Sequence, residues 1–241
     1  MDESLISAIR ERHQRILSQI AEATAKSGRE VGTVRLVVVS KSQPLEVVKA
    51  AIEAGASILG ENYAEEAVAK IAALPQSGVE WHMIGHVQSR KADLVAGHFS
   101  MLHSLDSIKL AGRLERCCDE SGHTLPVLLE VNVSGEESKF GFPAWNEDQW
   151  PELEPAFEQI MAFPHLALRG LMTMPPFFDN PEQARPYFQR LRRLQIYFSL
   201  RFPQAELTEL SMGTSADFIT AIEEGATYVR VGQAILGSRL L

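Results

Sequence analysis

Val34-Arg35-Leu36-Val37-Val38-Val39-Ser40-Lys41 is a short run of mostly β-branched and aliphatic residues that ends on a lysine. Such a run predicts a strand buried on both faces, as in a parallel sheet covered by helices. Ligands of such sheets bind at the carboxyl ends of the strands, which is where Lys41 lies. A buried ammonium group must be paired, neutral or covalently engaged. The plainer alternative is a rim lysine that simply reaches water.

The rest of the chain continues this alternation of strand and helix. Residues 3–27 predict a long amphipathic helix that Gly28 ends. Seven more strands are expected, over residues 57–61, 81–85, 101–105, 126–133, 166–173, 207–212 and 228–231. Alternation of this kind predicts right-handed βαβ units and a parallel sheet. Eight units predict a single α/β domain that spans residues 1–241. They favour a closed (β/α)8 TIM barrel with an extra N-terminal helix rather than an open doubly wound sheet.

Composition narrows the classes of partner. A net charge of -8 argues against nucleic acid and anionic membranes, although it is compatible with a local basic pocket for one phosphate. The only cysteines, Cys117 and Cys118, are adjacent, so they are expected as reduced thiols, and no metal-ligand spacing surrounds them. No signal peptide and no apolar run of about 20 residues is evident. We therefore expect a cytoplasmic protein.

Residues 211–217 (SMGTSAD) place small residues between a strand and a helix. Their backbone N–H groups and the positive helix end suit an anion, and the loops after strands seven and eight of barrels often hold phosphate. Gly232 and Gln233 supply the matching loop after strand eight. A tight turn with Ser215 or Thr214 as N-cap is the purely structural alternative.

Arg230 lies in the middle of the last strand, between two valines. If the valines face the helices, the guanidinium faces the barrel interior and must find a partner, for which a salt bridge to Glu61 or Glu130 is the structural alternative. A closed barrel places the last strand beside the first, so Lys41, Arg230 and the two loops would surround one cavity. Together they suit pyridoxal 5′-phosphate (PLP) as cofactor.

In that arrangement, Lys41 forms an imine with the PLP aldehyde, and residues 211–214 with Gly232 and Gln233 hold the phosphate. Arg230 donates to the pyridine nitrogen and keeps it unprotonated, which weakens the ring as an electron sink.

The chain resembles the YggS-like pyridoxal phosphate homeostasis proteins, also called proline synthase co-transcribed homologues. The resemblance covers nearly the whole chain in order and is strongest in the last two motifs. The motifs that carry it are VVSK (38–41), GENY (60–63), WHMIGHVQ (81–88), HSLD (103–106), SKFG (138–141), GLM (170–172), SMGTSADF (211–218) and RVG (230–232). It implies a fold-type III PLP barrel like the alanine racemase N-terminal domain. Arg90 departs from the family, which often has asparagine there.

The implied cofactor-binding residues are Lys41, Asn62, Met83, Ser211, Met212, Gly213, Thr214, Arg230, Gly232 and Gln233. No catalytic residue and no metal ligand is assigned. The resemblance places Asn62 near the cofactor ring, while a capping box with Glu65 is a sufficient structural reason for this asparagine.

Three other side chains in these motifs have plainer interpretations. His82 is expected as a hydrogen-bonded core histidine and His86 as a rim residue. Lys139 follows two glutamates, so a solvated charge run is the default interpretation. A second aldehyde-accepting site at Lys139 is the alternative.

Two functions from different classes remain open. The first is a carrier or buffer of PLP that supports intracellular vitamin B6 and amino-acid homeostasis, with PLP-dependent apoenzymes as recipients and a monomer or weak dimer as its state. The second is a PLP-dependent amino-acid racemase of the alanine racemase type, which needs two opposed acid/base groups. No second base is evident, and the chain ends at Leu241 without a second domain, so a carrier is favoured over a turnover enzyme. An aldolase-like barrel that uses Lys41 without PLP is a weaker alternative.

Overall fold

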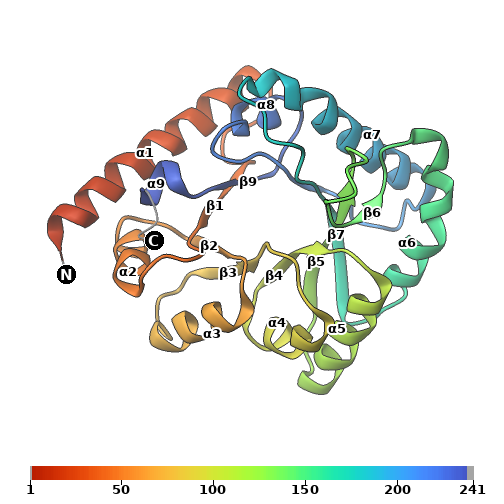
Figure 1. Ribbon diagram of the computed structural model, residues 1–241, viewed down its shortest axis with the longest axis horizontal. Coiled ribbons are helices and arrows are strands. Elements are labelled where there is room, and N and C mark those ends of the chain that lie inside the picture. Colours follow the sequence, from red (N-terminus) through yellow and green to blue (C-terminus); the bar gives the residue numbers. More distant parts are fainter. Residues whose placement is uncertain (1, 238–241) are drawn as a thin grey trace.

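Eight parallel strands close into a barrel in the computed structural model, which describes residues 2–237 (Figure 1). The strand order is β4-β3-β2-β1-β9-β8-β7-β5, and β4 pairs with β5 to complete the circle. A two-residue strand, β6, pairs in parallel with Val131 and Asn132 at the end of β5. The strands are β1 (Arg35–Val39), β2 (Ile58–Glu61), β3 (Glu80–Met83), β4 (Met101–Leu105), β5 (Leu125–Asn132), β6 (Phe142–Pro143), β7 (Leu166–Met172), β8 (Glu209–Ser211) and β9 (Tyr228–Val231). The predicted (β/α)8 barrel is confirmed.

Helices surround the barrel on its outer side (Figure 1). They are α1 (Glu3–Lys26), α2 (Leu45–Glu53), α3 (Ala64–Ala73), α4 (Ala92–His98), α5 (Ile108–Ser121), α6 (Glu154–Met161), α7 (Arg185–Arg201), α8 (Phe218–Glu223) and α9 (Gln233–Leu236), with 3-10 turns η1 (Ser89–Lys91), η2 (Glu147–Leu153) and η3 (Pro181–Ala184). Among these described helices, none combines the length and the apolar character that a membrane crossing requires.

Helix α1 lies across the seam between the first and the last strand. Asp2 caps it by accepting from the backbone N–H groups of Ser4 and Leu5. Its buried face packs against α2 on one side of the seam and against α8 and α9 on the other. Arg12 adds a side-chain hydrogen bond of 2.6 Å to the carbonyl of Ile235. The extra N-terminal helix thus joins the two ends of the barrel.

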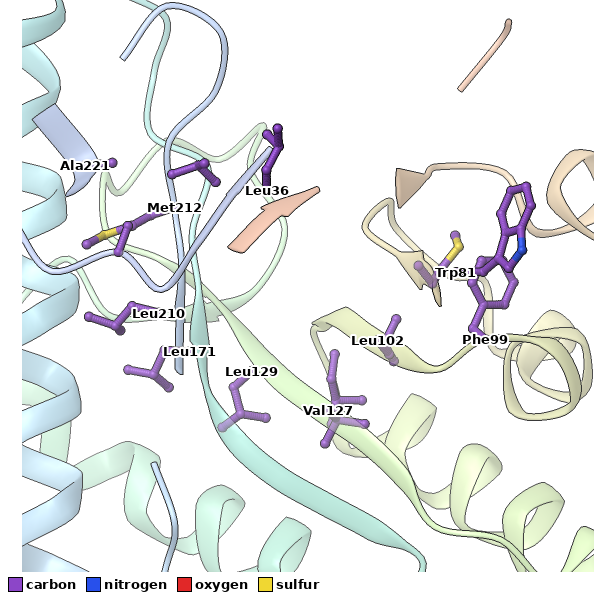
Figure 2. Packing of buried hydrophobic residues seen from close by; sticks show 14 of the residues in the cluster. Leu36, Trp81, Phe99, Leu102, Val127, Leu129, Leu171, Leu210, Met212 and Ala221 are labelled. Carbon is purple, nitrogen blue, oxygen red and sulfur yellow. The ribbon is translucent and has the colours of Figure 1, made fainter. Parts of the chain in front are cut away.

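Alternation along the strands divides the apolar residues into two clusters. A small cluster fills the barrel interior and includes Val37, Met101 and Tyr228. A larger cluster lies between the strands and the helices; Figure 2 shows part of it, with Leu102, Val127 and Leu129 on neighbouring strands. Because successive side chains point to opposite faces, the interior positions on β3, β4 and β9 are left to His82, His103 and Arg230.

Candidate functional site

A cavity of about 680 Å³ lies at the carboxyl ends of the strands. Residues from the loops after β1, β2, β3, β5, β7, β8 and β9 line it. Within the described part of the chain, the lining contains Lys41, Lys91, Lys139 and Arg230 against a single carboxylate, Glu130. A chain of net charge -8 thus concentrates cations around one cavity, which suits an anionic ligand.

The position of Lys41 is fixed by hydrogen bonds that its two neighbours in the sequence, Ser40 and Ser42, make. The buried Ser40 hydroxyl donates to Glu61 Oε1 at 2.7 Å, and the Ser40 carbonyl accepts from Lys70 Nζ at 2.8 Å. On the other side, the Ser42 backbone N–H donates to Glu66 Oε1 at 2.8 Å. These contacts tie the end of β1 to β2 and α3, and so they fix where the Lys41 side chain starts.

Lys70 is the centre of this anchoring network, which the sequence did not reveal. Its ammonium lies 2.8 Å from Glu61 Oε1 and 2.6 Å from Glu66 Oε1, and its side chain is only 8% exposed. Burial raises the pKa of Glu61, while the hydrogen bonds and charge of Lys70 oppose that rise. The Lys70 charge is therefore compensated within the protein.

Arg230 points into the barrel interior and reaches the cavity floor, as its position between Val229 and Val231 predicted. Its Nη1 donates to Ser211 Oγ, and its Nη2 donates to the carbonyl of Thr173 at 2.9 Å. Burial lowers the pKa of Arg230 to about 10, so the guanidinium stays charged at neutral pH. The alternative salt bridge is not formed among the described residues, since Glu61 pairs with Lys70 and no carboxylate lies within 4 Å of Arg230.

Glu130, at the end of β5, is the carboxylate of the cavity. Burial, followed by the charge of Asp106, raises the pKa of Glu130 to about 7, and Arg230 and Lys139 oppose the rise. At neutral pH the group is therefore close to half-protonated. Glu130 is thus the cavity's candidate acid or base, a role that the sequence did not suggest because Glu130 was considered only as a partner for Arg230.

The turn after β8 lines the cavity with Thr214, Ser215 and Ala216. Asp217 Oδ1 accepts from the Thr214 backbone N–H at 2.7 Å and from its hydroxyl at 3.0 Å. The backbone N–H groups of Ser215 and Ala216, which line the cavity, have no acceptor within residues 2–237. Asp217 is at the N-cap position of α8, so the purely structural alternative, an N-cap at Ser215 or Thr214, is not formed.

Two glycines let neighbouring loops approach each other at the cavity floor. A Cβ atom on Gly85 would lie 2.6 Å from the Asn62 Cα atom, and one on Gly232 would lie 3.0 Å from the Val39 carbonyl oxygen. The missing side chain of Gly85 thus allows Asn62 to reach the cavity. The predicted capping box of Asn62 with Glu65 is not formed, because α3 starts one residue later, with Tyr63 at the N-cap position and no side-chain cap.

The structure brings six of the ten predicted cofactor-binding residues to the cavity: Lys41, Asn62, Thr214, Arg230, Gly232 and Gln233. Met83, Ser211, Met212 and Gly213 do not line it. Met83 and Met212 lie in the apolar cluster between the strands and the helices. The buried Ser211 hydroxyl contacts Arg230 and His103 inside the barrel. Alternation directs the side chains of Met83 and Met212 outward, and cofactor contact at these four positions stays a prediction.

Ser215 and Ala216 also line the cavity, although they are not among the ten predicted cofactor-binding residues. Their position in the loop after a barrel strand is the sequence signal that identifies them as candidates. His86 is a rim residue as predicted; its ring stacks on Phe140 with centroids 4.0 Å apart. Lys139 also lines the cavity.

The other two motif side chains lie away from the cavity. His82 is the expected core histidine, with both ring nitrogens in hydrogen bonds. Arg90 donates to Gln88 and does not line the cavity.

The fold and this cavity define a parallel (β/α)8 barrel with a lysine and an arginine at one site on the carboxyl ends of its strands. The protein-family model described as "Alanine racemase, N-terminal domain" matches residues 14–239 of this chain. Curated relatives named pyridoxal phosphate homeostasis protein include one from Aquifex aeolicus, 39% identical over 95% of this chain and 97% of the relative. Another, from Escherichia coli, is 37% identical over 93% of this chain and 94% of the relative.

Solved structures agree with these matches. PipY of Synechococcus elongatus PCC7942 with PLP bound is 34% identical, with a TM-score of 0.79 over 90% of this chain and 100% of PipY. The alanine racemase of Streptomyces coelicolor A3(2), 19% identical with a TM-score of 0.72 over 95% of this chain and 58% of the racemase, shares the fold. The chain belongs to the alanine racemase N-terminal domain family and, within it, to the pyridoxal phosphate homeostasis proteins.

Proposed function

We propose that the protein binds PLP in the carboxyl-end cavity and carries or buffers it, with the cofactor held as a Schiff base on Lys41. The observation that carries this proposal is the convergence of Lys41 and the buried Arg230 on one cavity of about 680 Å³. The volume is in the range of cofactor pockets. The names of the curated relatives and the PLP-bound PipY structure support the choice of cofactor.

The lining fits the separate parts of PLP. The backbone N–H groups of Ser215 and Ala216, which find no acceptor among the described residues, suit the phosphate together with the loop at Gly232. The Arg230 guanidinium suits the pyridine nitrogen, since it donates hydrogen bonds and keeps its charge. Asn62 offers an amide to a ring substituent. Ser211, Met83, Met212 and Gly213 do not line the cavity, so the proposed contact set rests on the other six residues.

Bound PLP supplies an aldehyde that condenses with a lysine amine, releasing water. Lys41 provides that amine from a backbone anchored at Ser40 and Ser42. Reversal of the condensation by water returns the aldehyde, which is the property that a carrier needs. PLP-dependent apoenzymes are the proposed recipients, and vitamin B6 and amino-acid homeostasis is the proposed role. A monomer or weak dimer in the cytoplasm stays a prediction.

A PLP-dependent amino-acid racemase is the second candidate, because the cavity contains a titratable carboxyl. Glu130, whose burial raises its pKa to about 7, can exchange protons near neutral pH. Racemisation requires groups on both faces of the substrate, and Lys41 with Glu130 is the pair this cavity offers. Carriage is favoured because the curated relatives are named for homeostasis.

The deciding experiment is the visible absorption of the purified protein. The protein should be yellow, and Lys41→Ala should lose the imine band, while Lys139→Ala, which removes another lysine of the same cavity, should keep it. A band that survives Lys41→Ala and disappears with Lys139→Ala would place the aldehyde on the other lysine. Incubation with L-amino acids should give no D-isomer by chiral chromatography; catalytic inversion of any of them would overturn the carrier in favour of the racemase.

A further inference from the structure

A continuous chain of polar side chains crosses the barrel interior from Arg230 to the opposite end of the barrel. Arg230 contacts Ser211 Oγ, which lies 2.8 Å from His103 Nδ1. His103 Nε2 lies 3.0 Å from His82 Nδ1, and His82 Nε2 lies 3.2 Å from Glu80 Oε2. Glu80 begins β3, so it is at the amino ends of the strands, and its side chain is 60% exposed. The three residues between the two ends are almost completely buried.

The hydrogen positions along this chain follow from its two ends. The Glu80 carboxylate can only accept, so His82 Nε2 carries the proton and His82 Nδ1 accepts. His103 must then donate from Nε2 and accept at Nδ1, where the Ser211 hydroxyl donates. The serine oxygen accepts from Arg230, which can only donate. One direction of donation therefore satisfies every member of the chain.

Both histidines must be neutral for this pattern, and their surroundings make them so. Burial lowers the pKa of His82 to about 4, and it lowers the pKa of His103 well below its usual range. The Tyr228 ring packs edge-on against both imidazoles, with centroids 5.7 Å from His82 and 5.0 Å from His103. Arg35 lies over the Tyr228 ring and pairs with Glu209, so its charge is compensated beside the chain.

The row of hydrogen bonds also bears on how the buried charge of Arg230 is stabilised. The direct partners of the buried Arg230 among the described residues are neutral groups, and the carboxylates of Asp217 and Glu130 act on its charge from beyond hydrogen-bond distance. The row of hydrogen bonds ends on a further carboxylate, Glu80, and hydrogen bonds in series polarise one another in a low-dielectric interior.

We propose that Glu80, His82 and His103 are positioning residues that act on Arg230 through Ser211, so that a carboxylate at one end of the barrel orients the guanidinium in the cavity at the other end. The Ser211 oxygen accepts from Arg230 only while its own hydrogen is committed to His103, and His103 is held in that tautomer by His82 and Glu80. We call this row of hydrogen bonds from Glu80 to Arg230 the relay. Its effect on PLP rests on the proposed function, whereas the orientation of Arg230 by the relay does not.

The test uses Glu80→Gln, a change at an exposed site far from the cavity. Glu206→Gln is the matched control, because Glu206 is also an exposed carboxylate, lies just before β8 and pairs with Arg169 instead of a histidine. Ring 15N NMR of the cofactor-free protein at pH 7.5 should show His82 and His103 as single Nε2–H tautomers. In Glu80→Gln, both histidines should become tautomer mixtures and the Arg230 Nε–H signal should shift; in Glu206→Gln, none of these signals should change.

The loaded protein gives an independent readout. PLP should dissociate about threefold more readily from Glu80→Gln, the loss expected when one hydrogen bond is weakened, and unchanged from Glu206→Gln. Unaltered histidine tautomers and an unaltered Arg230 signal in Glu80→Gln would overturn the relay, whatever the cofactor does. Altered signals in a protein that never takes up PLP would keep the relay and overturn the proposed function instead.

Discussion

Lys70 and Arg230 are both buried cations next to the cavity end of the barrel, and they are treated in opposite ways. Lys70 lies outside the strands and contacts two carboxylates, Glu61 and Glu66. Arg230 lies inside them, 4% exposed, and its direct partners among the described residues are a hydroxyl, a carbonyl and a thioether. The charge of Lys70 is paired with carboxylates that stabilise the fold, whereas the guanidinium of Arg230 can still interact with a ligand.

This difference separates an anchor from a binding group, although both residues are cations of similar burial. The carboxylates of Lys70 come from β2 and from its own helix, so the pair fixes backbone positions around Lys41. Arg230 keeps donors for whatever occupies the cavity.

Replacing Lys70 should damage the fold most. Lys70→Met leaves Glu61 buried without its ammonium partner, which typically costs about 3 to 5 kcal/mol of unfolding free energy. Urea denaturation measures this loss. Lys26→Met is the control, since Lys26 is exposed and pairs only with Glu22 one helical turn away, and it should change little. A Lys70 variant as stable as the control would show that this pair is not an anchor.

Replacing Glu130 tests whether the cavity carboxyl compensates Arg230. Its pKa rises from 4.5 to about 7 on folding, so the folded state holds a proton that the unfolded state releases between these values. Stability therefore falls as pH rises through this window, by about 3 kcal/mol when complete. Glu130→Gln should thus stabilise the cofactor-free protein above pH 7 and have little effect near pH 4.5.

Denaturation curves at several pH values measure this difference, with Glu136→Gln as an exposed control. A Glu130→Gln protein that is less stable than the wild type at pH 8 would mean that the ionised carboxylate pairs with Arg230 after all. Arg230 would then be paired with a carboxylate as Lys70 is, and the contrast between the two cations would not hold.

Replacing Arg230 should affect the ligand more than the fold. Arg230→Gln removes a desolvated cation together with its hydrogen bonds to neutral groups, so the unfolding free energy without cofactor should change by less than about 1 kcal/mol. Affinity for PLP should fall about tenfold, equal to about 1.4 kcal/mol, with a changed absorption band. Titration followed by spectroscopy measures both. Unchanged affinity and spectrum would remove Arg230 from the ring site.

The barrel was predictable because local patterns determine it. Unbroken aliphatic runs mark buried parallel strands, as in β1 and β5, and the predicted limits of β4 and β9 are identical to the observed ones. Errors occur where backbone geometry decides between neighbouring residues. Helix α3 starts after Tyr63, so Asn62 is one residue too early to cap it, and the α8 cap falls on Asp217.

The site was predictable only in part, because its chemistry depends on contacts between distant strands. Lys41 and Arg230 could be paired from barrel closure alone, and their strands do pair. The direction of Ser211 into the interior, the burial of Glu130 and the anchoring by Lys70 depend on packing across three or more elements. No spacing along the chain encodes those distances.

Helix α1 has a consequence for how the chain reaches this state. Part of its buried face packs against α2, and another part is covered by α8 and α9, which follow it by about 190 residues or more. During synthesis the part of α1 that α8 and α9 cover therefore stays exposed until nearly the whole chain is available. Closure of the β1–β9 seam, docking of α1 and the meeting of Lys41 with Arg230 thus become one late event, so an incomplete chain has no formed cavity.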